Sequence, residues 1–333
     1  MKKFLLTALL FACTAVTAQT QTQNPPQLAN RYAMKLTRQP DGSYALQSGE
    51  ARYARVIDLS TYGDDLLVPY THRNNRLHGR DYQGVETRDI VYRTHDGYEL
   101  QMAVDLAVSD RPAPVVIFCH GGGWSRGDNS SQRSLSQYLA KQCGITGVRV
   151  NYTLAPQPGA TVEVSVADVL AAVQYVRDHA AELNADPARI GFVGTSAGAH
   201  LAAVGAMQTP ETKLFVGYSG IYDLETAAIC QRSKDPERIG YFCDRDPRVL
   251  RRVSPESIIP KKTKIAVQLF CGTADITVEC EQSKSFARAL RKHGATVDLQ
   301  VYEKYDHNLS SKSSDKMEEI FFKSVDFIVE HLK

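Results

Sequence analysis

From about residue 85 onward, short apolar segments typical of strands alternate with longer amphipathic segments typical of helices. Segment 115–119 is continuously apolar, as expected of a strand buried on both faces of a parallel sheet. Strands that alternate with helices form a mostly parallel sheet with helices on both faces, so we predict an α/β fold over residues 85–333. The expected strands are 115–119, 147–152, 190–194, 214–218, 265–271 and 297–302, and the expected helices are 135–142, 164–183, 197–207, 279–293 and 317–332.

Two segments of this region depart from the alternation. Residues 89–92 and 100–106 predict an antiparallel pair of strands around the turn His95-Asp96-Gly97. Residues 222–260 are polar, rich in arginine and interrupted by proline, so we expect them to form a small polar cap inserted into the fold. An arginine run of this kind is usually a solvated face, and the alternative is contact with an acidic substrate. The arginines concerned are Arg232, Arg238, Arg245, Arg248, Arg251 and Arg252.

The N-terminus has the pattern of a secretory signal peptide. A positively charged start, Met1-Lys2-Lys3, precedes the apolar run 4–11, and the small residues Val16-Thr17-Ala18 precede Gln19. We therefore expect residues 1–18 to be removed near Ala18–Gln19 and the protein to be exported. Lipid attachment at Cys13 is the minority alternative. The apolar run is too short to span a bilayer, and no other stretch approaches ~20 apolar residues, so we expect no transmembrane helix.

Residues 19–84 are expected to be a leader and an accessory extension that precede the α/β domain. The composition of 19–30 is typical of a disordered segment. Residues 32–38 and 43–46 predict a hairpin with its turn at Asp41-Gly42. The sequence does not indicate what this extension does.

The charge balance excludes some partners. Without Lys2 and Lys3, the 39 basic residues fall to 37, which equals the 37 acidic ones. A neutral chain of this kind lacks the excess positive charge typical of nucleic-acid-binding proteins, and it is not attracted to anionic membranes.

The cysteines that remain after cleavage leave the disulfide pairing open. Cys230 and Cys243 flank one loop, Cys271 and Cys280 flank another, and Cys119 ends an apolar strand and is expected to be a buried thiol. Cys143 completes the set. None of these spacings is that of a zinc site, so we predict no metal.

Gly194-Thr195-Ser196-Ala197-Gly198 matches the pattern G-x-S-x-G. It follows a predicted strand and opens a predicted helix, which is the context in which this motif presents a nucleophilic serine on a sharp turn. The helix N-terminus also favours an anion. We therefore predict Ser196 as a nucleophile.

A nucleophilic serine needs a base and a group that orients the base. His307 lies in a loop directly after the last predicted strand, where catalytic residues are common. His293, His331 and His200 lie in or at the ends of helices, and we expect them to be structural. Asp275 follows the strand 265–271 and precedes His307, which is the usual order of the acid, with Asp223 as its competitor. Asp306 is adjacent to His307, so its carboxylate is not expected to reach the ring.

His120-Gly121-Gly122-Gly123-Trp124 follows the strand 115–119. Glycines allow backbone N–H groups to approach a ligand without a clash at Cβ. We expect the N–H groups of Gly122, Gly123 and Ala197 to form an oxyanion hole. Trp124 either lines a substrate site or packs beneath the loop.

Together these motifs resemble the α/β-hydrolase superfamily, and most closely its HGGGW esterases near the hormone-sensitive-lipase-like and bacterial feruloyl or acetyl-xylan esterase groups. The resemblance covers residues 85–333. The matching segments are 120–124, 151–156, 186–190, 194–198 with 200–202, 272–275, and His307.

The resemblance implies a Ser196–His307–Asp275 triad, an acyl-enzyme and no cofactor. With export, it favours a small-molecule or oligosaccharide ester as substrate, with an acetyl or feruloyl group removed from carbohydrate. The alternatives are an amidase, formamidase or small peptidase on the same fold, and a non-catalytic binding protein. Such binding relatives normally lack the serine or the histidine.

Overall fold

The computed structural model describes residues 34–38, 44–48, 54–57, 85–311 and 316–333 of the chain. The predicted signal segment 1–18, its cleavage site and the alternative lipid anchor Cys13 lie outside these residues. The chain divides into two compact units, one with the strands before residue 58 and one with the region from residue 85 onward.

The first unit contains a three-stranded antiparallel sheet. Strands β1 (Met34–Arg38) and β2 (Tyr44–Ser48) pair with each other, and Leu36 lies opposite Leu46. This pairing is the one predicted for the hairpin, whose turn at Asp41-Gly42 lies outside the described residues. Strand β3 (Ala54–Ile57) adds to β2 and was not predicted.

The second unit is built on an eight-stranded sheet in the order β11-β10-β9-β8-β6-β7-β5-β4. The pairs from β7 through β6, β8, β9 and β10 to β11 are parallel, whereas β4–β5 and β5–β7 are antiparallel. This confirms the predicted mostly parallel sheet with its antiparallel entry. The strands are β4 (Thr87–His95), β5 (Tyr98–Asp105), β6 (Ala113–Cys119), β7 (Thr146–Val150), β8 (Ala185–Thr195), β9 (Thr212–Tyr218), β10 (Ala266–Gly272) and β11 (Thr296–Tyr302).

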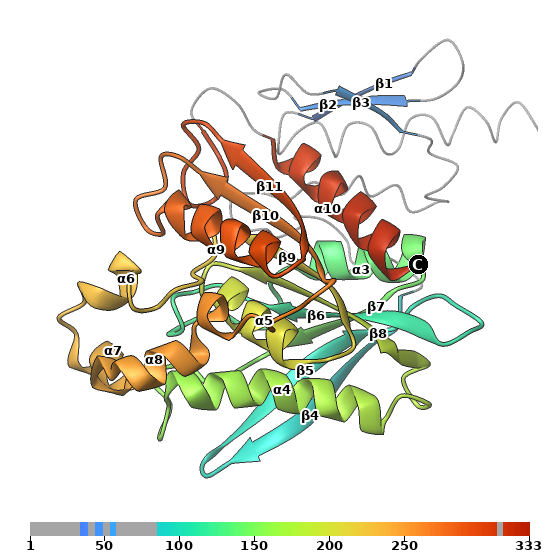
Figure 1. Cartoon of the computed structure of the whole chain (residues 1–333). Coiled ribbons are helices and arrows are strands. Elements are labelled where there is room, and N and C mark those ends of the chain that lie inside the picture. Colours follow the sequence, from blue (N-terminus) through green and yellow to red (C-terminus); the bar gives the residue numbers. More distant parts are fainter. Residues whose placement is uncertain (1–33, 39–43, 49–53, 58–84, 312–315) are drawn as a thin grey trace, which may run out of the picture. The chain divides into compact units, whose positions relative to one another are not determined.

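Helices cover both faces of this sheet because alternate residues of the buried strands point to opposite sides. On β6, Ile117 belongs to one core cluster and Phe118 to the other. Side chains of α3 (Arg133–Cys143) and α10 (Met317–Leu332) complete the Phe118 cluster. Side chains of α4 (Val162–Asp178), α5 (Ala197–Gln208) and α9 (Cys280–Lys292) complete the Ile117 cluster. Figure 1 shows these helices packed around the sheet.

Helix α4 ends at Asp178, earlier than the predicted end at residue 183. The residues that follow form turns, with the N–H of Leu183 bonded to the His179 carbonyl. Asn184 then adopts φ 46°, and its side-chain amide donates to the carbonyls of Ser109 and Arg111. These bonds tie the chain to the loop before β6, so the reversal into β8 begins before the amphipathic pattern ends.

A buried ion pair joins the antiparallel entry to the parallel strands. The Arg149 guanidinium on β7 donates to both oxygens of Asp105 on β5, at 2.8 and 3.1 Å. The hydroxyls of Thr87 and Ser136 also donate to this carboxylate. Both charged side chains are buried, so the charge of each must be compensated by the other.

The cap, residues 222–260, consists of short helices, and its prolines begin three of them. Pro236, Pro247 and Pro255 stand in first turns, where the missing N–H of proline costs no hydrogen bond. The cap also contributes large apolar side chains to the core, among them Tyr241 and Phe242. It is therefore an insertion packed onto the domain. Its helices are α6 (Ala228–Gln231), α7 (Pro236–Tyr241), η2 (Cys243–Arg245), α8 (Pro247–Val253) and η3 (Pro255–Ile258).

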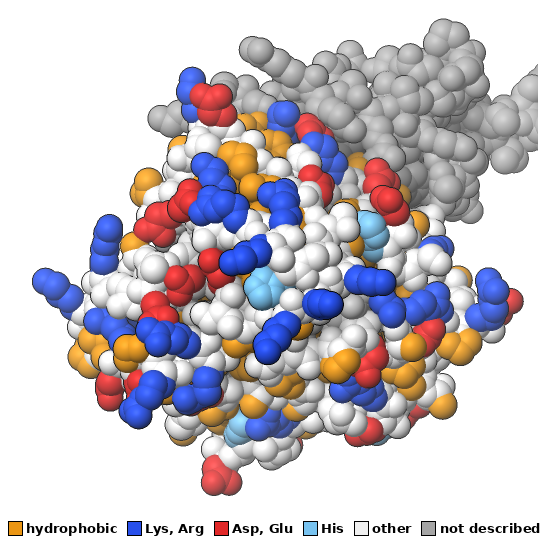
Figure 2. Space-filling view, viewed as in Figure 1, with side chains coloured by type: hydrophobic (Ala, Val, Ile, Leu, Met, Phe, Trp, Pro, Cys, Tyr) orange, Lys and Arg blue, Asp and Glu red, His pale blue; other side chains and the backbone are white. Residues whose placement is uncertain are grey.

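Most of the cap's outer arginines have partners within the protein. Arg248, Arg251 and Arg252 form ion pairs with carboxylates, each at 2.9 Å. Arg245 donates to backbone carbonyls. Figure 2 shows Lys and Arg side chains interspersed with Asp and Glu over one face of the molecule. Of the helices that the structure describes, none is both long and apolar enough to cross a bilayer.

Candidate active site

Ser196 occupies the turn between β8 and α5 with a positive φ, which is uncommon for a residue other than glycine. Its φ is 55°, and its N–H donates to the Tyr218 carbonyl at 2.8 Å. A Cβ on Gly194 would lie 2.3 Å from the Gly198 carbonyl oxygen, and a Cβ on Gly198 would lie 2.1 Å from that of Cys119. The glycines of the motif are therefore required by backbone contacts, as predicted.

Ser196, His307 and Asp275 form one chain of hydrogen bonds. The His307 Nδ1 lies 2.7 Å from Asp275 Oδ2, and its Nε2 lies 2.9 Å from Ser196 Oγ. An ionised carboxylate only accepts, so Nδ1 carries the proton and Nε2 is left to accept from the serine hydroxyl. The structure thus brings the three predicted residues together in the geometry of a nucleophile, a base and an orienting acid.

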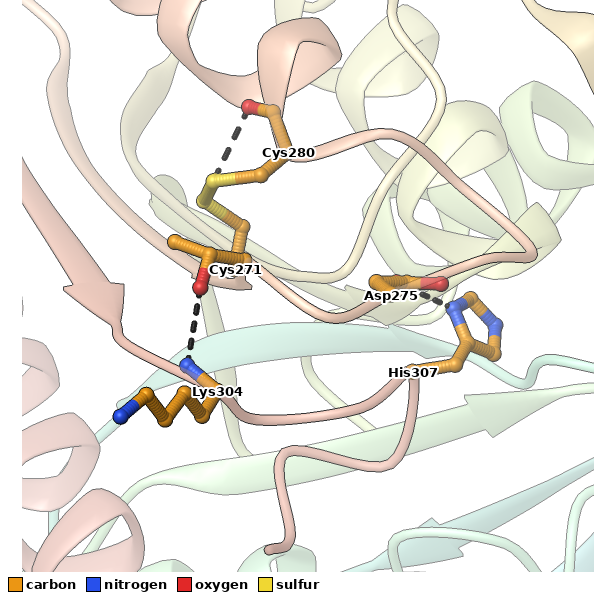
Figure 3. Close-up of a disulfide and its surroundings, with 6 residues drawn as sticks. Cys271, Asp275, Cys280, Lys304 and His307 are labelled. Carbon is orange, nitrogen blue, oxygen red and sulfur yellow. Dashed lines mark hydrogen bonds and ion pairs between the residues drawn. A yellow bond between two sulfur atoms is a disulfide. The ribbon is translucent and has the colours of Figure 1, made fainter.

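The loop that carries Asp275 is held at both ends. Asp275 Oδ1 accepts the N–H groups of Thr277 and Val278 at 2.8 and 2.9 Å. A disulfide between Cys271 and Cys280 closes the loop, and Figure 3 shows Asp275 facing His307 beside it.

Three backbone N–H donors also connect the Asp275 loop to the segment before His307. The N–H of Thr273 donates to the Tyr302 carbonyl at 3.0 Å, and the N–H of Ala274 donates to the Tyr305 carbonyl at 2.9 Å. The N–H of Lys304 donates to Thr273 Oγ1 at 2.8 Å. The acid and the base are therefore positioned against each other by their loops.

The competing candidates have other roles. Asp223 and Asp306 accept hydrogen bonds within their own turns. His293 bonds to the Pro260 carbonyl, and His331 packs edge-on against Phe327. The structure thus keeps these side chains out of the hydrogen-bond chain, as the sequence predicts.

The glycine loop after β6 lies beside Ser196. Gly122 and Gly123 adopt φ of 122° and 62°, in the region that favours glycine. The N–H of neither residue donates to another described backbone group. The N–H of Ala197 is in the first turn of α5, where an α-helix has no acceptor of its own. These donors are available to an anion, as an oxyanion hole requires.

Two buried histidines support the loop. The His120 ring stacks on Tyr152 at 4.3 Å, and the Tyr152 hydroxyl donates to the His120 carbonyl at 2.7 Å. His200 Nδ1 accepts from Trp124 Nε1, which requires Nε2 to donate to the Val253 carbonyl at 2.7 Å. Burial lowers the pKa of both His120 and His200 to about 4, so both rings are neutral near pH 7.

The expectation that Trp124 lines a substrate site is wrong. Its indole is completely buried and packs against His200 and Phe242, and it is not among the residues that line the cavity. The ring stays inside because its N–H finds an acceptor there. Trp124 therefore packs beneath the glycine loop, which is the other role that the sequence allows.

A cavity of about 830 Å³ opens over Ser196 and His307. Sequence reasoning missed several residues of its wall, because they carry no motif and reach the site only through the fold. Of the cap arginines, only Arg238 reaches it. The missed residues are Ser125, Arg126, Gly127, Ser131, Gln132, Tyr218, Ile229, Thr277, Asn308 and Leu309.

The structure also shows which cysteines pair and whether side chains are grouped to bind a metal. Cys271 pairs with Cys280, whereas Cys119, Cys143, Cys230 and Cys243 are free. Cys119 is the buried thiol that its strand predicts. Within the described residues, no group of three or more His, Cys, Asp or Glu side chains is placed to hold a metal ion.

Comparisons with known proteins point to esterases. A probable isoprenylcysteine alpha-carbonyl methylesterase of Arabidopsis thaliana is 29% identical over 66% of this chain, which covers 50% of that protein. Esterase LipQ of Mycobacterium tuberculosis is 31% identical over 75% of this chain, which covers 60% of that protein. The chain thus spans half to somewhat under two thirds of the length of these relatives.

A solved structure has the same fold. Apo esterase 2 of Thermogutta terrifontis superposes with a TM-score of 0.62 at 26% identity, over 74% of this chain and 95% of that one. The same esterase has been solved phosphorylated by paraoxon and with propionate bound. The BD-FAE family model matches residues 104–290, which is more than half of the chain. The chain therefore belongs to the BD-FAE family and has the α/β-hydrolase fold.

Proposed function

We propose that the protein is a serine carboxylic ester hydrolase. The observation that carries this proposal is the unbroken hydrogen-bond chain from Asp275 through His307 to Ser196 at the floor of the cavity. The names of the relatives support it, since they are esterases.

In the first half of the reaction, Ser196 Oγ attacks the ester carbonyl while His307 Nε2 takes the hydroxyl proton. Asp275 stabilises the imidazolium that forms. The N–H groups of Gly122, Gly123 and Ala197 stabilise the negative oxygen of the tetrahedral intermediate. His307 then gives its proton to the alkoxide leaving group, so an alcohol departs and Ser196 keeps the acyl group.

In the second half, water takes the place of the alcohol. His307 removes a proton from the water, the hydroxide adds to the acyl carbonyl, and the new intermediate collapses. The proton returns to Ser196 Oγ, and a carboxylic acid is released. No step requires a cofactor.

For the substrate, we propose short acyl or feruloyl esters of carbohydrates. The resemblance of the sequence motifs to feruloyl and acetyl-xylan esterases supports this choice, and so does the cavity, which lies within the range of small-molecule sites. We also propose export with cleavage near Ala18–Gln19, which rests on the signal-like N-terminus. N-terminal sequencing of protein recovered from outside the cytoplasm tests it, because an intact Met1 or a lipidated Cys13 contradicts that cleavage.

The test is hydrolysis of p-nitrophenyl acetate, p-nitrophenyl octanoate and methyl ferulate, measured side by side. We expect acetate or ferulate turnover, little octanoate turnover, and none in Ser196→Ala or His307→Ala. Asp275→Asn should lose less activity than either, because the base remains. Turnover at the wild-type rate in Ser196→Ala refutes the proposal. Absence of turnover of all three by the folded wild type directs the search to amide substrates.

A further inference from the structure

The wall of the cavity above Ser196 is positively charged. Its only Arg or Lys side chains, among the described residues, are Arg126 and Arg238, and it contains no Asp or Glu. By contrast, the cap arginines Arg248, Arg251 and Arg252 are each paired with a carboxylate of this protein. Neither Arg126 nor Arg238 has such a partner within the described part of the chain.

Arg238 is held in place by uncharged groups. Its Nη2 donates to the Gly123 carbonyl at 3.1 Å, and its guanidinium lies 5.8 Å from the centre of the Trp124 ring. A guanidinium has five N–H donors, so most of them remain for a ligand. The side chain is thus fixed at the glycine loop without its charge being neutralised.

Arg126 lies close to Gly122 of the same loop. It lies on the segment that returns after Trp124, and a Cβ on Gly122 would lie 3.2 Å from its Cγ. Its side chain is exposed and has no described partner. Two arginines without a carboxylate partner among the described residues therefore line the cavity beside the glycine loop.

We propose that the preferred substrate is an ester that carries a carboxylate in its acyl or alcohol part, bound by Arg126 and Arg238. The planar fork of a guanidinium matches a carboxylate, and charge-assisted hydrogen bonds are about twice as strong as neutral ones. A carboxylate brings one negative charge to the two positive ones, whereas a neutral ester brings none. The inference rests on the proposed function and specifies its substrate class.

The test compares kcat/KM within two matched pairs. One pair is O-acetylated galacturonic acid against galactose acetylated at the same position, which differ by a carboxylate in the alcohol part. The other is p-nitrophenyl hemisuccinate against p-nitrophenyl butyrate, which differ by a carboxylate in the acyl part. We expect the acidic member of one pair to be favoured by about tenfold at low salt, and less at high salt, because exposed charges are screened.

Arg126→Gln and Arg238→Gln should each lower this ratio by about threefold or more. Arg248→Gln is the matched control, since Arg248 is an exposed cap arginine paired with Asp246 outside the cavity. The pair that shows the preference identifies the part of the substrate that carries the charge.

Hydrolysis of the neutral esters with no preference in either pair overturns the inference and leaves the proposed function intact. A preference that survives in both arginine variants also overturns it. Hydrolysis of none of the four compounds refutes the proposed function, and with it the inference that depends on it.

Discussion

The disulfide between Cys271 and Cys280 should stabilise the domain more than it supports catalysis. It closes a short loop, with a sequence separation of 9, and this loop carries Asp275. Replacing both cysteines with alanine releases the loop in the unfolded chain. From the loop-closure entropy, we expect unfolding to become easier by about 2.5 kcal/mol.

The effect on activity should be smaller because Asp275 is also held independently of the disulfide. Thr273 and Ala274 keep their backbone bonds to the segment before His307, and Asp275 keeps the N–H groups of Thr277 and Val278. Hydrogen bonds contribute about 1 kcal/mol each, so these four together exceed the roughly 2.5 kcal/mol lost with the disulfide. We therefore expect kcat to fall by less than about tenfold.

The assay is urea unfolding of Cys271→Ala/Cys280→Ala, with kcat measured on p-nitrophenyl acetate. Reduced wild-type protein is the comparison that separates loss of the cross-link from loss of the two sulfur atoms. Cys243→Ser, which removes a free and partly exposed thiol, is the control. An unchanged unfolding free energy would falsify the loop-closure reasoning. A loss of activity as large as that of Asp275→Asn would show that the hydrogen bonds alone do not position the acid.

Three further predictions concern backbone packing, protonation and the buried ion pair. Gly198→Ala should lower activity by more than about 100-fold or destabilise the fold by about 3 kcal/mol, because the new Cβ overlaps backbone oxygens. Gly240→Ala is the control and should have little effect, because a Cβ there meets nothing within 4 Å. Kinetics and thermal melting check this, and wild-type values for Gly198→Ala contradict it. Stability should fall as pH falls from about 6.5 to 4, because the unfolded chain binds protons there that buried His120 and His200 do not. The two histidines together change the free energy of unfolding by up to about 2.7 kcal/mol per pH unit. His200→Gln should halve this contribution, as measured by urea unfolding at several pH values. Arg149→Met should cost about 3–5 kcal/mol, since it leaves the Asp105 carboxylate buried and uncompensated. A loss below 1 kcal/mol in the same unfolding assay would contradict this.

The parts of the site that the sequence predicts are those imposed by local backbone geometry. Gly194 and Gly198 flank Ser196 because a Cβ at either position would overlap the backbone, so the motif and the turn imply each other. His307 follows the last strand, and Asp275 follows the strand beside it, so parallel topology alone brings both to one edge of the sheet. Residue order together with position directly after a strand predicted both.

Features that depend on distant contacts could not be read from the sequence. Trp124 is buried because His200, far along the chain, accepts its N–H. Cys271 and Cys280 pair while Cys230 and Cys243 do not, although both pairs flank a loop, because pairing depends on how each loop folds. Arg238 lines the cavity because the cap folds back to Gly123, whereas none of the other cap arginines lines it.

The central claim is that Ser196 is the nucleophile, and covalent trapping tests it most directly. The protein would be treated with paraoxon, and the modified residue would be identified by mass spectrometry of its peptides. We expect one diethylphosphoryl group on Ser196 with complete loss of esterase activity, and slow or absent labelling in His307→Ala. A folded protein that is not labelled, or one that is inactivated through a different residue, would contradict it.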